Sequence, residues 1–160
     1  VLSLHLPLKQ KSMIEQFNFD IQLIFAILNG KVSAAINRKL LRNFRQNGLD
    51  ITPEQWTVLL YLWEKDGVAQ QELCNATFKD KPSMTRLIDN MERQQLVVRM
   101  SDRKDRRTNK IHLTATGKNL EEKARFIANK TLKEALHGLT LEELKVSQEV
   151  LRKIFHNTQS

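Results

Sequence analysis

Cationic side chains near the middle of the chain have the composition of a phosphate-binding segment. Arg103, Lys104, Arg106 and Arg107 lie within five consecutive residues. A guanidinium group presents five N–H donors in a fixed fork that matches phosphate oxygens. The segment therefore predicts binding to a polyanion such as duplex DNA, whereas a solubilising hairpin tip is the alternative reading of the same composition.

The helix expected just before this segment has one apolar and one polar face. The apolar face follows the helical spacing i, i+3, i+4, i+7 and consists of Met84, Leu87, Ile88 and Met91. Side chains outside that face could contact bases or phosphates, and the predicted contacts are Lys81, Pro82, Ser83, Thr85, Arg86 and Asn90. Arg86 is the best of them because a guanidinium pairs with phosphate or guanine, whereas Asn90 fits an ordinary exposed position equally well. Asp89 would repel phosphate unless it orients a neighbouring Arg.

The excess positive charge gathers around these two segments. The 160 residues include 26 Lys and Arg against 18 Asp and Glu, a formal net charge of +8. Residues 79–118 hold eleven Lys and Arg against five Asp and Glu, a net charge of +6, which leaves +2 for the other 120 residues. This concentration favours a nucleic acid over a membrane as partner.

A long helix is expected to precede these segments. Apolar positions recur every three or four residues from Phe17 to Phe44, and Gly48 supplies a left-handed stop. About 30 residues would extend roughly 45 Å, which is longer than one small core can cover. This helix is therefore expected to pack against a second copy of the chain.

Shorter elements are expected to hold the polar helix and the cationic segment in place. Thr52, Pro53 and Gln55 form a capping box that begins a helix, and residues 71–74 belong to a short helix after it. Two alternating stretches, 96–101 and 110–113, flank the cationic segment and predict a hairpin.

The helical period returns after the hairpin. One helix is expected from Thr114 to Gly138, and a second capping box of Thr140 and Glu143 begins the last helix. Two short helices, then the polar-faced helix and then a cationic hairpin form the winged helix-turn-helix pattern. In this pattern the third of these helices enters the major groove and the hairpin reaches the minor groove.

Several stretches of this pattern resemble the MarR (multiple antibiotic resistance regulator) family. They are Asp80 to Glu92, Leu96-Val97, Asp102 to Arg107 and Leu113-Thr114-Ala115-Thr116-Gly117, within a resemblance over residues 17–157. The resemblance implies a mainly α fold, a winged helix-turn-helix with long N- and C-terminal dimerisation helices and a small β-hairpin wing. It divides the chain into an N-terminal tail (1–16), dimerisation helices (17–48 and 114–157) and a DNA-binding part (49–113) within one continuous domain.

The same resemblance implies a function. The chain would be a homodimeric transcription regulator that binds a palindromic operator in double-stranded DNA, and an effector-responsive repressor. Asp102 and Asp105 would structure the wing, and Arg107 would reach the minor groove. A small aromatic or lipophilic effector would bind at Trp56, between the dimerisation and DNA-binding parts, although a Trp more often packs in a core. The family usually has Gly where this chain has Gln94-Gln95, which predicts a less sharp turn.

Other classes of protein are disfavoured by what the chain contains. Its one cysteine, Cys74, excludes an intramolecular disulfide and a cysteine-based zinc site, suits a reducing cytoplasm, and is expected to be an inert buried thiol. The four histidines lack ligand spacing, and no phosphate loop, hydrolase motif or stretch of about 18 apolar residues occurs. We therefore expect a cytoplasmic protein with no enzymatic activity, metal, cofactor or membrane contact. The alternative is a winged-helix module that docks to an acidic protein without operator specificity.

Overall fold

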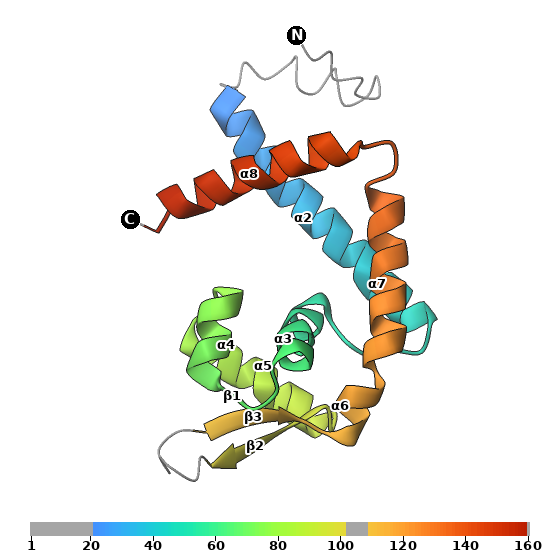
Figure 1. Cartoon of the computed structure of the whole chain (residues 1–160), viewed down its shortest axis with the longest axis vertical. Coiled ribbons are helices and arrows are strands. Elements are labelled where there is room, and N and C mark those ends of the chain that lie inside the picture. Colours follow the sequence, from blue (N-terminus) through green and yellow to red (C-terminus); the bar gives the residue numbers. More distant parts are fainter. Residues whose placement is uncertain (1–20, 102–108, 160) are drawn as a thin grey trace. The chain divides into compact units, whose positions relative to one another are not determined.

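The chain is mainly helical and carries a small antiparallel sheet, as expected. The computed structural model describes residues 21–101 and 109–159, with side chains from residue 25 onward (Figure 1). The chain divides into two compact units, residues 1–38 and 39–160, and each is described by itself. The elements in chain order are α2 (Ile21–Gln46), α3 (Pro53–Glu64), β1 (Val68–Ala69), α4 (Gln70–Thr77), α5 (Lys81–Arg93), β2 (Val97–Ser101), β3 (Asn109–Leu113), α6 (Ala115–Asn119), α7 (Glu121–Ala135) and α8 (Leu141–Asn157).

One hydrophobic core holds the larger unit together. The apolar face predicted for α5 is confirmed, because all four of its members are buried. The core draws on α2, α3, α4, α5, β3 and α7, and its buried apolar side chains include Phe44, Val58, Leu59, Leu62, Leu73, Met84, Ile88, Met91, Ile111 and Ile127. The polar face of α5 is thereby turned to solvent.

The helix-turn-helix is formed by α4 and α5. Its turn has three residues, of which Phe78 adopts a left-handed conformation (φ 55°) that ends α4. The predicted capping box of Thr52 and Gln55 begins α3. The Tyr61 hydroxyl on α3 donates to the Ala76 carbonyl at 2.8 Å, which ties α3 to α4.

The sheet has three strands in the order β1-β3-β2. The predicted hairpin is β2 paired with β3, with Arg99 opposite Ile111 and Ser101 opposite Asn109. The third strand, β1, was not predicted, because two residues are too short to show an alternation. The buried positions Val97 and Ile111 belong to the inward face of the sheet, so Arg99 lies on that face as well.

The turn at Gln94-Gln95 differs from the sequence prediction. The Gln95 amide donates to the Glu92 carbonyl and the Leu96 amide to the Met91 carbonyl, both at 2.9 Å, which is a Schellman motif. Gln95 has φ 58°, the conformation that glycine adopts at this position. The prediction of a less sharp turn was therefore wrong. The Gln94 side chain supports the turn, since it donates to the Asp50 carbonyl at 3.0 Å and accepts from Gln55 at 2.7 Å.

Replacing Gln95 by glycine should stabilise the protein. A side chain in the left-handed region costs roughly 1 kcal/mol, so Gln95→Gly should raise the free energy of unfolding by about that amount in a urea titration. Gln94→Gly is the matched control, because Gln94 has φ −81° and loses both side-chain hydrogen bonds. The control should destabilise the protein by about 1–2 kcal/mol. No gain from Gln95→Gly would contradict the strain at this turn.

The segment after the hairpin is two helices where one was predicted. Leu120 separates α6 from α7. Its backbone N–H donates to the Lys118 carbonyl rather than to a carbonyl four residues earlier, as it would within a continuous α-helix. Thr114 caps α6 by accepting from the Gly117 amide at 3.1 Å. Gly117 is buried against the Leu96 carbonyl. The short α6 thus seats the end of the hairpin against the helices.

The last helix, α8, has no buried residue in the single chain. Its exposed apolar side chains are Leu141, Val146, Val150, Leu151, Ile154 and Phe155. In the smaller unit, α2 likewise exposes Phe25, Ile27, Leu28 and Val32. Within the described residues, no helix is both long enough and apolar enough to cross a bilayer.

Candidate nucleic-acid interface

The beginning of α5 is fixed by its own cap. Asp80 accepts from the Ser83 amide and from the Ser83 hydroxyl, both at 2.8 Å. These two hydrogen bonds hold the pKa of the Asp80 carboxyl below its ordinary value, the backbone amide contributing most. Pro82 in the first turn is compatible with the helix because its missing N–H needs no partner there.

The structure distinguishes two groups among the predicted DNA contacts on α5. One group is exposed and consists of Lys81, Pro82, Arg86 and Asn90. Ser83 and Thr85 are half-buried and hold the helix in place. The Ser83 hydroxyl donates to Asp80, while the Thr85 hydroxyl donates to the Lys81 carbonyl at 2.9 Å and accepts from Gln70 at 2.8 Å.

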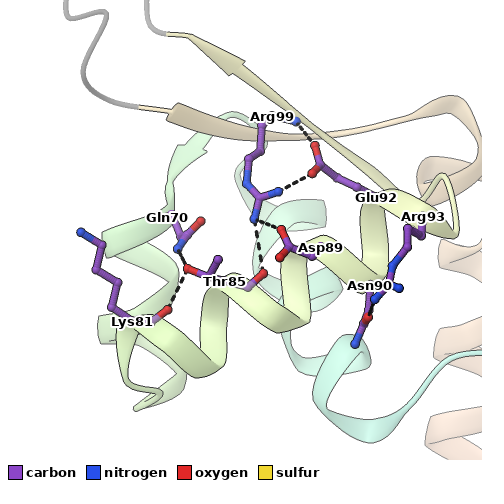
Figure 2. A network of polar contacts seen from close by, with 8 residues as sticks. All are labelled: Gln70, Lys81, Thr85, Asp89, Asn90, Glu92, Arg93 and Arg99. Carbon is purple, nitrogen blue, oxygen red and sulfur yellow. Dashed lines mark hydrogen bonds and ion pairs between the residues drawn. The ribbon is translucent and has the colours of Figure 1, made fainter.

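Arg86 is a cation on α5 that is available to a partner. Its side chain is exposed, and no hydrogen bond or ion pair joins its guanidinium to any other described residue. Arg93, at the end of the helix, donates to the Asn90 side chain, and no ion pair joins it to a carboxylate of the described residues. The Asn90 amide nitrogen remains oriented away from this bond (Figure 2).

A second arginine, Arg99 on β2, points toward α5 between Glu92 and Asp89, as Figure 2 shows. Its Nη2 lies 2.7 Å from Asp89 Oδ1, and its Nη1 donates to Glu92 Oε2. Both carboxylates of α5 are therefore compensated. The cations of the α5 surface, Lys81 and Arg86 among them, keep a net positive field toward solvent.

The remaining predicted DNA contacts and wing residues lie outside the described residues. They are Asp102, Arg103, Lys104, Asp105, Arg106 and Arg107. The structure does describe the ends of the hairpin to which they belong, since Ser101 pairs with Asn109. Their roles remain predictions.

Trp56, the predicted effector contact, is half-buried in an aromatic cluster. Its ring centroid lies 5.7 Å from that of Phe44 and 5.5 Å from that of Trp63. The Trp63 indole donates to the Gly117 carbonyl at 3.0 Å, and the Arg125 guanidinium lies over its ring. Core packing accounts for these contacts, and an effector role for Trp56 remains a prediction. Cys74 is buried, as expected for an inert thiol.

Sequence reasoning missed the groups that orient α5 from its two sides. These are Gln70 on α4 and Arg99 on β2, which both bind Thr85. A signal for Arg99 was present, since it shares the strand face of buried Val97 and faces two acids spaced i, i+3 on α5. Across the described parts of the chain, no three His, Cys, Asp or Glu side chains gather as a metal site would require.

Comparison with known proteins agrees with this arrangement. A sequence model of the MarR family matches residues 49–108. The solved structure of the transcriptional regulator PA3341 is 32% identical, with a TM-score of 0.71 over 84% of this chain and 98% of that one. The MepR–DNA complex of S. aureus is 27% identical, with a TM-score of 0.74 over 88% and 99% of the two chains. Bordetella bronchiseptica BpsR, whose DNA binding is regulated by 6-hydroxynicotinic acid, is 20% identical, with a TM-score of 0.76 over 86% and 97%.

The fold and the exposed cationic helix define the class as winged helix-turn-helix transcription regulators. Within that class, the chain belongs to the MarR family, since both the sequence model and a solved relative at 32% identity match it. Its fold and family are those of proteins that regulate transcription and are not enzymes.

Proposed function

We propose that the protein binds a palindromic operator in duplex DNA as a homodimer and represses transcription from it. The observation that carries the proposal is the guanidinium of Arg86 on the solvent face of α5, which is exposed and has no partner among the described residues. The opposite face of α5 is buried, and a three-residue turn connects it to α4. A helix held in this way can enter a major groove with Arg86 toward the bases or phosphates.

Homodimerisation is supported by the apolar surface of the terminal helices. In the single chain, α8 leaves a broad apolar face in solvent, and α2 leaves another. Monomeric proteins rarely expose contiguous apolar patches of this kind. A second copy of the chain is the expected cover. A two-fold dimer would present two α5 helices to half-sites about one helical turn, or roughly 10 base pairs, apart.

An effector that controls DNA binding completes the proposal. The support comes from BpsR, whose DNA binding is regulated by a small aromatic acid. In this chain a small aromatic or lipophilic compound that reached Trp56 would meet the rings of Phe44 and Trp63. Movement of these rings would be transmitted to α6, because Trp63 is bonded to Gly117.

The Arg86 side chain gives the sharpest test. A random pool of 30-base-pair duplexes is selected with the wild-type protein, and the affinity for the enriched duplex is measured by anisotropy. Arg86→Ala should weaken binding by about 1–3 kcal/mol, roughly 5- to 150-fold. A phosphate contact would also lower the salt slope by about 1, whereas a guanine contact would relax the choice of base at one position.

Arg152→Ala is the matched control, since Arg152 is an exposed arginine on α8 and lies outside the proposed DNA interface. It should bind the duplex as the wild type does. An equal loss in both variants would contradict a specific role for Arg86. Failure of intact wild-type dimers to enrich any duplex would favour the alternative function, docking to an acidic protein.

A further inference from the structure

We propose that Arg99 is a positioning residue, which fixes the wing hairpin against the DNA-binding helix α5 through Asp89, Glu92 and the Thr85 carbonyl. The proposal rests on the function proposed above. In this role Asp89 and Glu92 on the helix and Arg99 on the strand need not contact DNA themselves.

The contacts converge on a single guanidinium. Arg99 Nη2 lies 2.7 Å from Asp89 Oδ1 and donates to the Thr85 carbonyl at 3.3 Å, and its Nη1 donates to Glu92 Oε2. The backbone amide of Arg99 also donates to Glu92 Oε1, at 2.8 Å. Glu92 therefore binds both the main chain and the side chain of the same strand residue (Figure 2).

The three acceptors form one stripe along α5. Residues 85, 89 and 92 follow the spacing i, i+4, i+7, which puts them on one side of a helix across two turns. One planar guanidinium spans this stripe, and a lysine ammonium at that position could not present the same fork. The Arg99 side chain is only 21% exposed, so solvent screens these bonds less than it screens an ordinary surface pair.

The helical turn of α5 that contains Thr85 is also bound from α4. Gln70 donates to the Thr85 hydroxyl, while Arg99 donates to the Thr85 carbonyl. The helix is thus fixed between α4 and β2 at the level of Thr85. Arg86, the exposed candidate DNA contact, is the next residue along the helix.

This arrangement sets the direction in which the hairpin leaves the helix. Arg99 lies on β2 two residues before Ser101, where the described part of the strand ends. A winged helix must place one helix in a groove and its hairpin on the adjacent one at the same time, so a change of the angle between them separates the two contacts. The pairing also explains why Asp89 is compatible with a DNA-binding surface, since its charge is neutralised by Arg99.

The sign of the effect of Asp89→Ala distinguishes positioning from repulsion. An acid that merely faced DNA would repel phosphate, and its removal would strengthen binding. A positioning role predicts that binding of the selected duplex becomes weaker, by about 5- to 10-fold, although alanine is the better helix former. Glu122→Ala on α7 is the matched control, an exposed acid far along the chain from α5, and it should leave the affinity unchanged.

Arg99→Lys tests the same role without a change of charge. The positive field is retained while the fork is lost, so the affinity should fall about tenfold. Hydroxyl-radical footprints should retain the central protection made by α5 and lose the flanking protection made by the wing. An unchanged footprint, an affinity equal to that of the wild type, or tighter binding by Asp89→Ala would overturn the proposal.

A measurement without DNA separates this proposal from the function on which it rests. The Arg99 amide is bonded to Glu92, so its hydrogen exchange should accelerate in Asp89→Ala and in Arg99→Lys but not in Glu122→Ala. Unchanged exchange in both variants would overturn the positioning role. Failure of the wild type to enrich any duplex would instead overturn the proposed function, whatever the exchange rates show.

Discussion

Gly117→Ala is expected to destabilise the protein more than alanine at any other described glycine. A Cβ atom at residue 117 would lie 2.1 Å from the Leu96 carbonyl oxygen and 3.2 Å from a Leu113 methyl group. The first contact is with backbone, which cannot rotate away as a side chain can. We expect the free energy of unfolding to fall by at least about 3 kcal/mol and the melting temperature by roughly 10 °C.

The loss should be specific to this position of α6. Thr116→Ala alters the exposed neighbouring residue and should change stability by less than about 0.5 kcal/mol. Both variants are compared by urea unfolding monitored through tryptophan fluorescence, because Trp63 donates to the Gly117 carbonyl. A free energy of unfolding of Gly117→Ala within about 1 kcal/mol of the wild type would contradict the close packing of α6 on Leu96.

Replacing two apolar residues of α8 by aspartate is expected to abolish the proposed dimer. Val150 and Ile154 are spaced i, i+4 and are both exposed in the single chain. If a second copy covers them, Val150→Asp with Ile154→Asp buries two carboxylates without partners, which costs several kcal/mol. The variant should sediment as a monomer, and its affinity for the selected duplex should fall by about 100-fold or more, because one half-site then binds alone.

Lys145→Asp provides a control with the same change of net charge. Lys145 lies on the polar side of α8, and its replacement by Asp also makes the chain more negative by two. This control should remain dimeric and bind DNA almost as the wild type does. Dimers of the Val150 and Ile154 variant with unchanged affinity would exclude α8 from the interface.

The parts of the fold that the sequence predicted are those determined by local chemistry. The capping boxes at Thr52 and Thr140 begin α3 and α8, and the apolar spacing from Met84 to Met91 identifies the buried face of α5. These signals lie within a few residues of each other and depend little on the rest of the chain. The break at Leu120 gave no such signal, because it results from the packing of α6 against the hairpin.

The turn after α5 shows a tertiary effect that overrides residue preference. Gln95 takes the left-handed conformation without being glycine, since Gln94 is bonded to Gln55 and Asp50 from a distant part of the sequence. Contacts across 39 and 44 residues cannot be found by inspection of a local window. The resemblance to relatives identified the position but not how this chain compensates for the missing glycine.

The candidate site was predicted in its composition and not in its internal connections. Arg86 is exposed as expected, whereas Ser83 and Thr85 are engaged within the fold. Asp89 was expected to repel DNA unless it orients an arginine, and its partner is Arg99. A spacing pattern identifies which residues share a face, but it does not say which strand brings a guanidinium to that face.

Operator recognition by α5 and the wing is tested by the affinity of the wild-type protein for its selected duplex, measured by anisotropy across salt concentrations. Two winged lobes that each neutralise two or more phosphates predict a slope of log affinity against log salt steeper than about −3. Operator recognition by a homodimer also predicts two chains per duplex and a clear preference for the selected duplex over a scrambled one. A slope near zero, or equal affinity for the scrambled duplex, would contradict operator recognition by α5 and the wing.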